Sequence, residues 1–208
     1  QLVGYSRPNR LFSFQNKVAT AKVVTDGAIG STSVNGPTNW SEGSIPSYYI
    51  DQSRIAGNGW GANAALHVAI LDTISFDYWK PLEMNMGQAN IPGMNPNSVP
   101  SKFFVFRNGD PAQMNALANM LQDSVPNGYY VLMWTWYWNM FWGYSPLPAN
   151  LNNVLTNLGA TQIANAQDSL PFAMIVKKGI PTSVVENVGP SKLPVLKNTP
   201  EFVFAVSF

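Results

Sequence analysis

An aromatic cluster in the second half of the chain offers the clearest binding chemistry. Residues 129–144 read YYVLMWTWYWNMFWGY and hold four of the seven Trp residues. Indole faces stack on sugar rings, whose axial C–H bonds present an apolar surface, and nearby amides bind the sugar hydroxyls. The candidate ligand-binding residues are Trp138, Asn139, Trp142, Tyr144, Gln167 and Asp168.

The same aromatic residues also have a plainer interpretation as core. If one face of a strand packs inwards, part of Trp134, Trp136 and Trp138 belongs to the core. Trp142 and Tyr144 lie past that strand, in a loop that we expect to face solvent or a partner. Docking of this loop onto a neighbouring domain of a longer protein therefore competes with sugar binding.

The side chains that enzymes use are scarce. The chain has one His, no Cys and no Gly-x-Ser-x-Gly sequence, so the usual nucleophile–base pairs and His-based zinc sites cannot be assembled from it. His67 lies within an apolar run, where a buried, hydrogen-bonded imidazole is the default. Asp72 and Asp77 resemble a carboxylate pair only in spacing. We predict no catalytic residue, metal or cofactor, and an enzyme is the least favoured class.

Composition narrows the classes of partner. Charged residues make up 11% of the chain, against roughly 25% in average soluble proteins. The 12 basic and 11 acidic residues form no long block that could follow a phosphate backbone, so we expect no nucleic-acid partner. No apolar stretch approaches the roughly 20 residues that span a bilayer. The start at Gln1 favours an excised or processed piece of a longer protein.

Two helices are predicted. Asp110 followed by Pro111 is an N-cap and first-turn pair, and apolar residues at helical spacing extend the helix from 111 to 123. A second helix runs from about Pro148 to Leu158, with Gly159 placed to cap its C-terminus.

Strands account for the rest of the core. We expect two or three short strands before Val24 and one near residues 48–50. The apolar run 66–71 predicts a buried strand, and residues 74–79 would pair with it or extend it. Lys177 and Lys178 follow the expected strand at 171–176 and are predicted to form its solvated end. The later strands are expected at 103–106, at 129–138 in the sheet centre, at 171–176 and at 202–208.

Several short segments, in order, resemble the interleukin-like EMT inducer (ILEI) family. Single pieces are unspecific, but five follow one another as in the family. They are Gly59 to Asn63 before LHVAILD, Ser75 to Trp79, the helix with Val125 to Gly128 and the strand YVLMWT, Leu158 to Ala160, and Asp168-Ser169 before AMIV with Lys178-Gly179.

The resemblance implies an α+β module of the ILEI-like β-β-α type, in which two antiparallel β-sheets pack as a sandwich-like core flanked by two main helices. It implies a single domain over 1–208, with N-terminal strands and long loops in 1–61 and the family core in 62–208. Members are non-catalytic and include secreted cytokine-like proteins and a sugar-binding stem domain. Similar modules occur in Bacteroidetes surface proteins, including gingipain-like peptidases exported by type IX secretion.

Two positions depart from the family pattern. Gln167 stands where the family has Arg, which removes a cationic fork from the edge that contacts sugar in the stem domain. The strand end that is acidic in the stem domain falls near Trp138 and Asn139. The sugar specificity of that stem domain is therefore not expected to transfer.

The sequence thus predicts a non-catalytic accessory module of a larger bacterial secreted or cell-surface protein. Its expected partner is a glycan, bound through the aromatic cluster, or a neighbouring domain. The alternative is a structural spacer or docking domain beside a gingipain-like peptidase domain.

Overall fold

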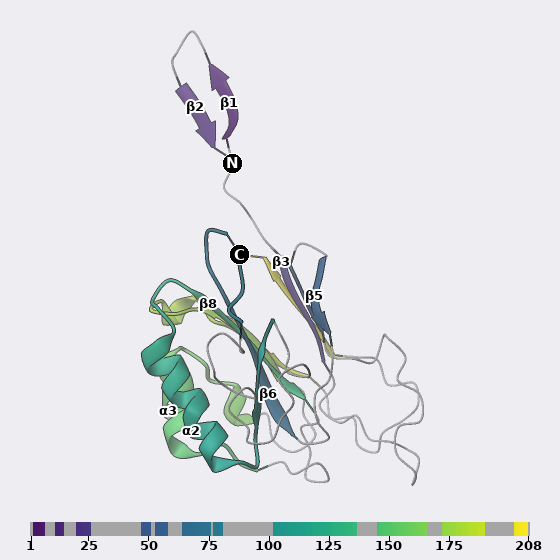
Figure 1. Cartoon of the computed structure of the whole chain (residues 1–208), viewed down its shortest axis with the longest axis vertical. Coiled ribbons are helices and arrows are strands. Elements are labelled where there is room, and N and C mark those ends of the chain that lie inside the picture. Colours follow the sequence, from purple (N-terminus) through teal and green to yellow (C-terminus); the bar gives the residue numbers. More distant parts are fainter. Residues whose placement is uncertain are drawn as a thin grey trace, which may run out of the picture.

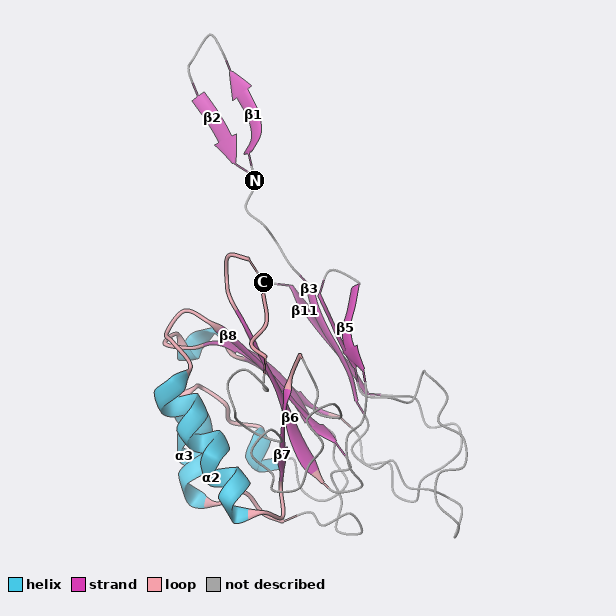
Figure 2. Ribbon diagram, viewed as in Figure 1, coloured by secondary structure: helices cyan, strands magenta, loops and turns pink. Residues whose placement is uncertain are grey.

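The computed structural model covers residues 1–208 and describes 2–6, 11–14, 20–25, 47–50, 53–57, 64–75, 77–80, 102–136, 145–165, 172–189 and 202–207. These residues form helices and antiparallel strands, so the mixed α+β class is confirmed (Figure 1). Helices α2 and α3 lie side by side on one side of the strands (Figure 2).

One open antiparallel sheet of five strands forms the centre of the fold. Its order is β10-β9-β8-β6-β7, so β8 lies in the middle as predicted. Every apolar residue of the expected strands at 66–71 and 103–106 falls in the core. The strands are β6 (Ala65–Leu71), β7 (Phe104–Arg107), β8 (Tyr130–Trp136), β9 (Phe172–Lys177) and β10 (Val185–Val188).

Six further strands are described through their backbone pairing. Three of them precede residue 26, as expected, whereas two strands rather than one lie between residues 25 and 61. The ribbon β1–β2 stands apart from the other strands in Figure 1, and the remaining four pair in the order β11-β3-β4-β5. They are β1 (Leu2–Ser6), β2 (Leu11–Phe14), β3 (Thr20–Thr25), β4 (Ser47–Ile50), β5 (Ser53–Gly57) and β11 (Phe202–Ser207).

The first predicted helix is confirmed, with its cap. Helix α2 (Pro111–Asn119) continues into a π-helical turn, η4 (Met120–Ser124). The Asp110 carboxylate accepts hydrogen bonds from the backbone N–H of Ala112 at 3.0 Å and of Gln113 at 3.3 Å. These two donors are among those that the first turn of a helix leaves without a partner, which is why Asp is favoured at this position.

The second predicted helix is confirmed as α3 (Ala149–Asn157). Gly159 follows it with φ +99°, a backbone conformation that glycine adopts without strain. A Cβ atom at Gly159 would also lie 2.3 Å from the carbonyl oxygen of Pro181. Both the turn and the close approach of the neighbouring loop therefore require glycine here.

Both faces of the five-stranded sheet are buried in its central strands. On one face, Leu66, Val68 and Met133 join the cluster that includes Leu117 of α2 and Leu155 of α3. The alternate residues of the same strands point the other way. These residues are also buried: Ala65, His67, Ala69, Leu71, Val105, Leu132, Trp134, Ala173 and Ile175. On this second face β3 approaches β8 and β11 approaches β9.

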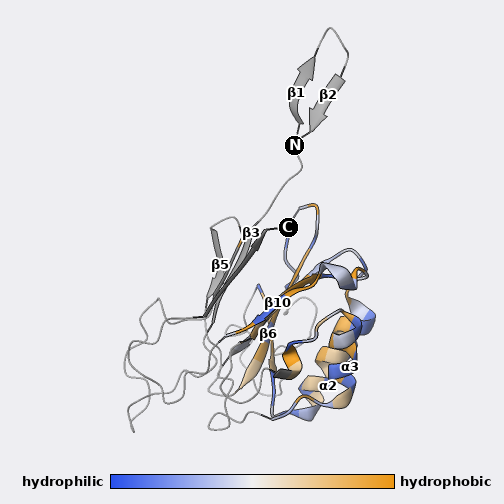
Figure 3. Cartoon of the chain, turned by 180° about the vertical axis from the view of Figure 1, so that it is seen from behind, coloured by the Kyte–Doolittle hydropathy of each residue, from blue (hydrophilic) through white to orange (hydrophobic). Residues whose placement is uncertain are grey.

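The hydropathy of the residues agrees with helices covered on one face and strands covered on both. In Figure 3, α2 and α3 carry both hydrophilic and hydrophobic residues, whereas the central strands are largely hydrophobic. A helix with one apolar stripe packs that stripe against a core, while a strand covered on both faces needs apolar residues at every position.

The segment 74–79 pairs with β6 as expected, but only near its end and without forming a strand: the backbone N–H of Trp79 donates to the carbonyl of Ile70 at 3.0 Å. Tyr78 alone pairs with Leu71, as an isolated bridge, and residues 73–75 form a turn. The carboxylate of Asp72 accepts hydrogen bonds from the backbone N–H of Ile74 at 2.7 Å and of Ser75 at 2.8 Å. Asp readily bonds the backbone two and three residues ahead, and this turn replaces the ladder that β-favouring residues would otherwise make.

Candidate functional site

All six candidate ligand-binding residues lie outside the described residues. Trp138, Asn139, Trp142 and Tyr144 belong to the segment 137–144, and Gln167 and Asp168 to the segment 166–171. The described residues on either side of the two segments nevertheless locate where each segment leaves and rejoins the fold.

The described residues that flank the segment 137–144 lie beside the start of β6. Trp136, the last residue of β8, pairs with Ala65. The backbone N–H of Ser145 donates a hydrogen bond to the side-chain oxygen of Asn108. Asn108 in turn donates its backbone N–H to the carbonyl of Ala64 at 2.8 Å. Both ends of this segment are therefore anchored next to residues 64 and 65.

The segment 166–171 rejoins the fold at the same end of the sheet. Phe172 begins β9 and lies next to the last residues of β8: its N–H donates to the Thr135 hydroxyl at 2.9 Å, and that hydroxyl donates to the Phe172 carbonyl at 3.4 Å. Thr135 is fully buried, so this link is sheltered from water. We call this end of the sheet, where β8 ends and β9 begins, the Trp136 end.

Asn108 is a residue of this end that sequence reasoning missed. It is 3% exposed, its oxygen is engaged by Ser145, and its Nδ2 atom has no hydrogen-bond partner in the described part of the chain. A buried amide donor of this kind normally finds a partner such as water. In the sequence, Asn108 before Gly109 looks like an ordinary turn residue, so no pattern distinguishes it.

His67 is buried within the sheet, as expected. Its ring centroid lies 5.0 Å from that of Phe103 and 5.5 Å from that of Trp134. Burial lowers the pKa of His67 from 6.5 to about 3, because desolvation penalises the charged imidazolium. The imidazole is therefore neutral at physiological pH and enclosed by aromatic rings. The core interpretation of Trp134 is likewise confirmed, since its side chain is buried.

The carboxylate of Asp72 accepts hydrogen bonds within its own turn. Hydrogen bonds from the backbone of Ser75 and Ile74 lower its pKa, and the side chain of Tyr129 contributes in the same direction. Within 64–75, 77–80 and the other described ranges, no group of three or more His, Cys, Asp or Glu residues could hold a metal ion.

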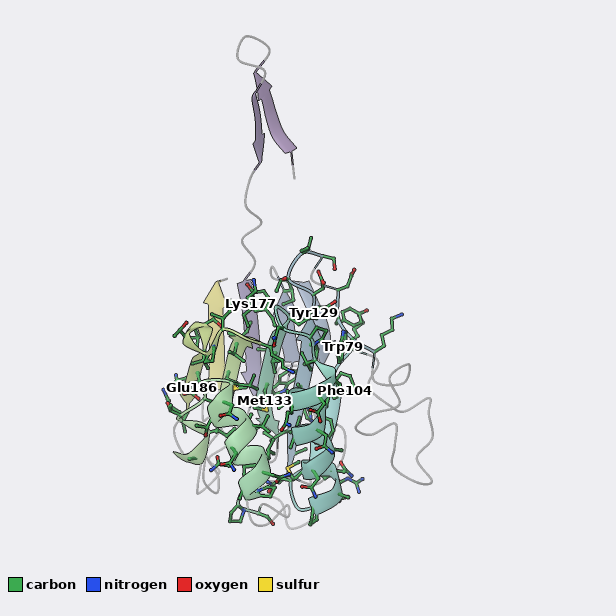
Figure 4. The ribbon with its side chains drawn as sticks, turned by 90° about the vertical axis from the view of Figure 1, so that its left-hand side faces the viewer. Trp79, Phe104, Tyr129, Met133, Lys177 and Glu186 are labelled. Atoms are coloured by element: carbon green, nitrogen blue, oxygen red, sulfur yellow. The ribbon has the colours of Figure 1, made fainter. Side chains whose placement is uncertain are left out.

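The opposite end of the sheet is held together by Lys178, so the expectation of a solvated strand end is wrong for this residue. Its ammonium group donates to the carbonyls of Gln122 at 2.7 Å and Val125 at 2.6 Å. A cation is favourable at a helix C-terminus, where carbonyls lack intrahelical partners. Tyr129 and Lys177 lie at this end in Figure 4. Lys177 is half-buried, with its ammonium 5.8 Å from the ring centroid of Tyr130.

Glu186 on β10 anchors the loop after α3. One carboxylate oxygen accepts hydrogen bonds from the Thr161 N–H at 2.7 Å, the Thr161 hydroxyl at 2.9 Å and the Gln162 N–H at 3.0 Å. The other oxygen, Oε2, is buried and has no partner among the described residues. No sequence pattern points to this residue, because none predicts strand β10.

Comparison with known proteins adds no family. No protein-family model matches the chain, and no curated protein matches it either. The fold and the geometry above therefore define a class only: a mixed α+β protein with an open antiparallel five-stranded sheet and two helices on one face. The likeness to the ILEI family stays a prediction. No helix among the described elements has the length and apolar character needed to cross a membrane.

Proposed function

We propose that this chain is a non-catalytic accessory module of a larger secreted or cell-surface protein, and that it binds carbohydrate through residues at the Trp136 end of the sheet. The binding residues are Trp138, Asn139, Trp142, Tyr144, Gln167 and Asp168. The proposal rests on their chemistry and on the positions of the described residues that flank them.

The observation that carries the proposal is the hydrogen-bonded link between Thr135 and Phe172. These residues lie just before the aromatic segment 137–144 and just after the segment 166–171. Segments that are about 30 residues apart in the chain therefore adjoin the same end of one sheet. A ligand site needs side chains from separate parts of the chain to converge on one place.

The chemistry of the two segments is complementary. The first supplies indole and phenol rings for stacking on sugar, and the second supplies an amide and a carboxylate for its hydroxyls. Asn108, with its unpartnered buried Nδ2, adds a polar group beside the first segment. This set offers a stacking surface and hydrogen-bonding groups for a sugar.

The finer fold assignment belongs to the same proposal. We infer that the strands β11-β3-β4-β5 cover the His67 face of the central sheet, which would give the sandwich-like core of an ILEI-like module. Support comes from the burial of His67, Trp134 and Ile175 on that face and from the approach of β3 to β8. An extracellular, Bacteroidetes-type parent protein follows only from the family likeness.

A glycan array probed with the purified wild-type chain tests the proposal. The test variant is Trp142→Ala with Tyr144→Ala, and the matched control is Ile74→Ala, an 84% exposed apolar residue beyond the opposite end of β6. We expect glycan binding by the wild type and the control and its loss in the double variant.

A folded wild type that binds no glycan would overturn the carbohydrate assignment. The alternative, docking onto a neighbouring domain of the parent protein, would then be tested with that domain as the probe. Glycan binding that persists in the double variant would place the site elsewhere on the molecule.

A further inference from the structure

Strand β10 forms one edge of the five-stranded sheet and is exposed to solvent. It pairs with β9 and has no second neighbour among the described strands. Val185 is 43% exposed, and Asn187 is also exposed. Figure 4 shows Glu186 at one side of the molecule and Phe104 of the other edge strand, β7, at the opposite side.

The backbone groups of Glu186 and Val188 point away from β9. Val188 pairs with Phe172, whose N–H donates to Thr135 on the other side, so this pair exchanges no ladder hydrogen bonds. The outward direction of the Glu186 carbonyl is also seen in its contact, because it accepts a long hydrogen bond of 3.4 Å from the side chain of Gln162. Apart from this carbonyl, the outward N–H and C=O groups of Glu186 and Val188 have no partner among the described residues, and such a row is a template for another strand.

The charge at this edge is incompletely matched. Three donors converge on Oε1 of Glu186, whereas Oε2 is buried without a partner among the described residues. The Glu186 carboxylate lies beside the strand, and a Lys or Arg side chain on an added strand would complement its charge. Beside it, exposed Val185 favours an apolar cross-strand neighbour.

The other edge lacks these features. Phe104, Val105 and Phe106 of β7 are buried, and the backbone N–H of Arg107 already donates to the side-chain oxygen of Gln113 at 2.8 Å. Of the two edges of this sheet, β10 is therefore the one open to an added strand.

We propose that β10 is a docking edge for an extended peptide strand of a partner protein, one that places Lys or Arg beside Glu186 and an apolar residue beside Val185. Strand addition supplies the missing backbone partners, and the alternate side chains supply specificity. A second copy of this chain fits less well, because two β10 strands paired about a two-fold axis would bring Glu186 carboxylates of like charge together. The proposal is independent of carbohydrate binding.

Nuclear magnetic resonance titration with two synthetic hexapeptides, TVKVTV and TVEVTV, tests this docking edge. At millimolar concentration we expect TVKVTV to shift the amide signals of Glu186 and Val188. The TVEVTV peptide should bind about threefold to tenfold more weakly, the range that opposite against like charges give across a strand pair. Loss of this preference in Glu186→Gln would assign it to the carboxylate.

The variant Val188→Pro removes an outward N–H, which an edge strand tolerates, and should abolish binding of both peptides. The Glu186→Gln result keeps the test decisive if the proline variant fails to fold. Absence of shifts along β10 with either peptide would overturn the proposal. Concentration-dependent association of the chain alone through β10 would also overturn it, in favour of a second copy.

Discussion

Among single residues, His67 should make the free energy of unfolding depend most strongly on pH. The folded chain holds the imidazole neutral because burial lowers its pKa from 6.5 to about 3. In the unfolded chain the same group takes up a proton near pH 6.5. Between pH 6.5 and about 3 the unfolded state therefore binds more protons, and the free energy of unfolding falls as the pH falls. Above pH 6.5 the group has no such effect.

The first prediction concerns this window. From pH 7 to about 4 the free energy of unfolding should fall by roughly 3 kcal/mol through His67, at up to about 1.4 kcal/mol per pH unit. In His67→Leu this slope should largely disappear. Urea unfolding at several pH values measures it.

The control is Asp72→Asn. The pKa of Asp72 is lowered below its ordinary 3.8, so its contribution is lost only as the pH falls below that value. The slope between pH 6.5 and 4 should therefore survive in this control. An equal slope in wild type and His67→Leu would contradict the assignment to His67.

At the scale of elements, two glycines have the same positive φ but different surroundings. Comparing substitutions at the two positions therefore separates backbone strain from steric contact. Gly128 has φ +93° with nothing within 4 Å of an added Cβ. Gly159 has φ +99° and faces the Pro181 carbonyl oxygen at 2.3 Å. The two positions share the conformational demand and differ only in the neighbouring loop.

The second prediction follows from that comparison. Gly128→Ala should lower the free energy of unfolding by about 1 kcal/mol, the usual penalty for a left-handed alanine. Gly159→Ala should cost about 3 kcal/mol or more, because the turn after α3 and the loop at Pro181 must also separate. Thermal unfolding followed by circular dichroism compares them. Similar losses in the two variants would show that the loop yields without cost.

On the scale of the whole molecule, protection from solvent should decrease from the centre of the sheet to the β10 edge. Strands β6 and β8 have neighbours on both sides and buried residues on both faces. Strand β10 has a neighbour on one side only. Stability against local opening follows burial and the number of hydrogen-bonded neighbours.

The third prediction is a pattern of amide hydrogen exchange. We expect the slowest exchange for the amides of Val68 and Met133, and the fastest within the sheet for Glu186 and Val188. The inward amides of Val185 and Asn187, in the same strand, should exchange more slowly than their neighbours. Uniform exchange along β10 would contradict the assigned backbone directions.

Local patterns predicted much of the fold. The caps at Asp110 and Gly159, the two helices and the buried run of β6 all depend on residues close in the chain, so spacing and turn chemistry suffice to find them. The two failures have different causes. Asp72 replaces an expected strand by a turn, and β10 has too few apolar residues to be recognised without its neighbour β9.

For the candidate site, the sequence by itself determined the residue types: aromatic rings in 129–144, an amide and a carboxylate at Gln167 and Asp168, and almost no catalytic side chains. Only the tertiary structure decided which residues distant in the chain lie next to one another. Thr135 and Phe172 meet although they are 37 residues apart, and Lys178 reaches Gln122 across 56 residues. Such partners depend on strand order, which arises when separate segments bury their apolar faces together, and no local pattern specifies it.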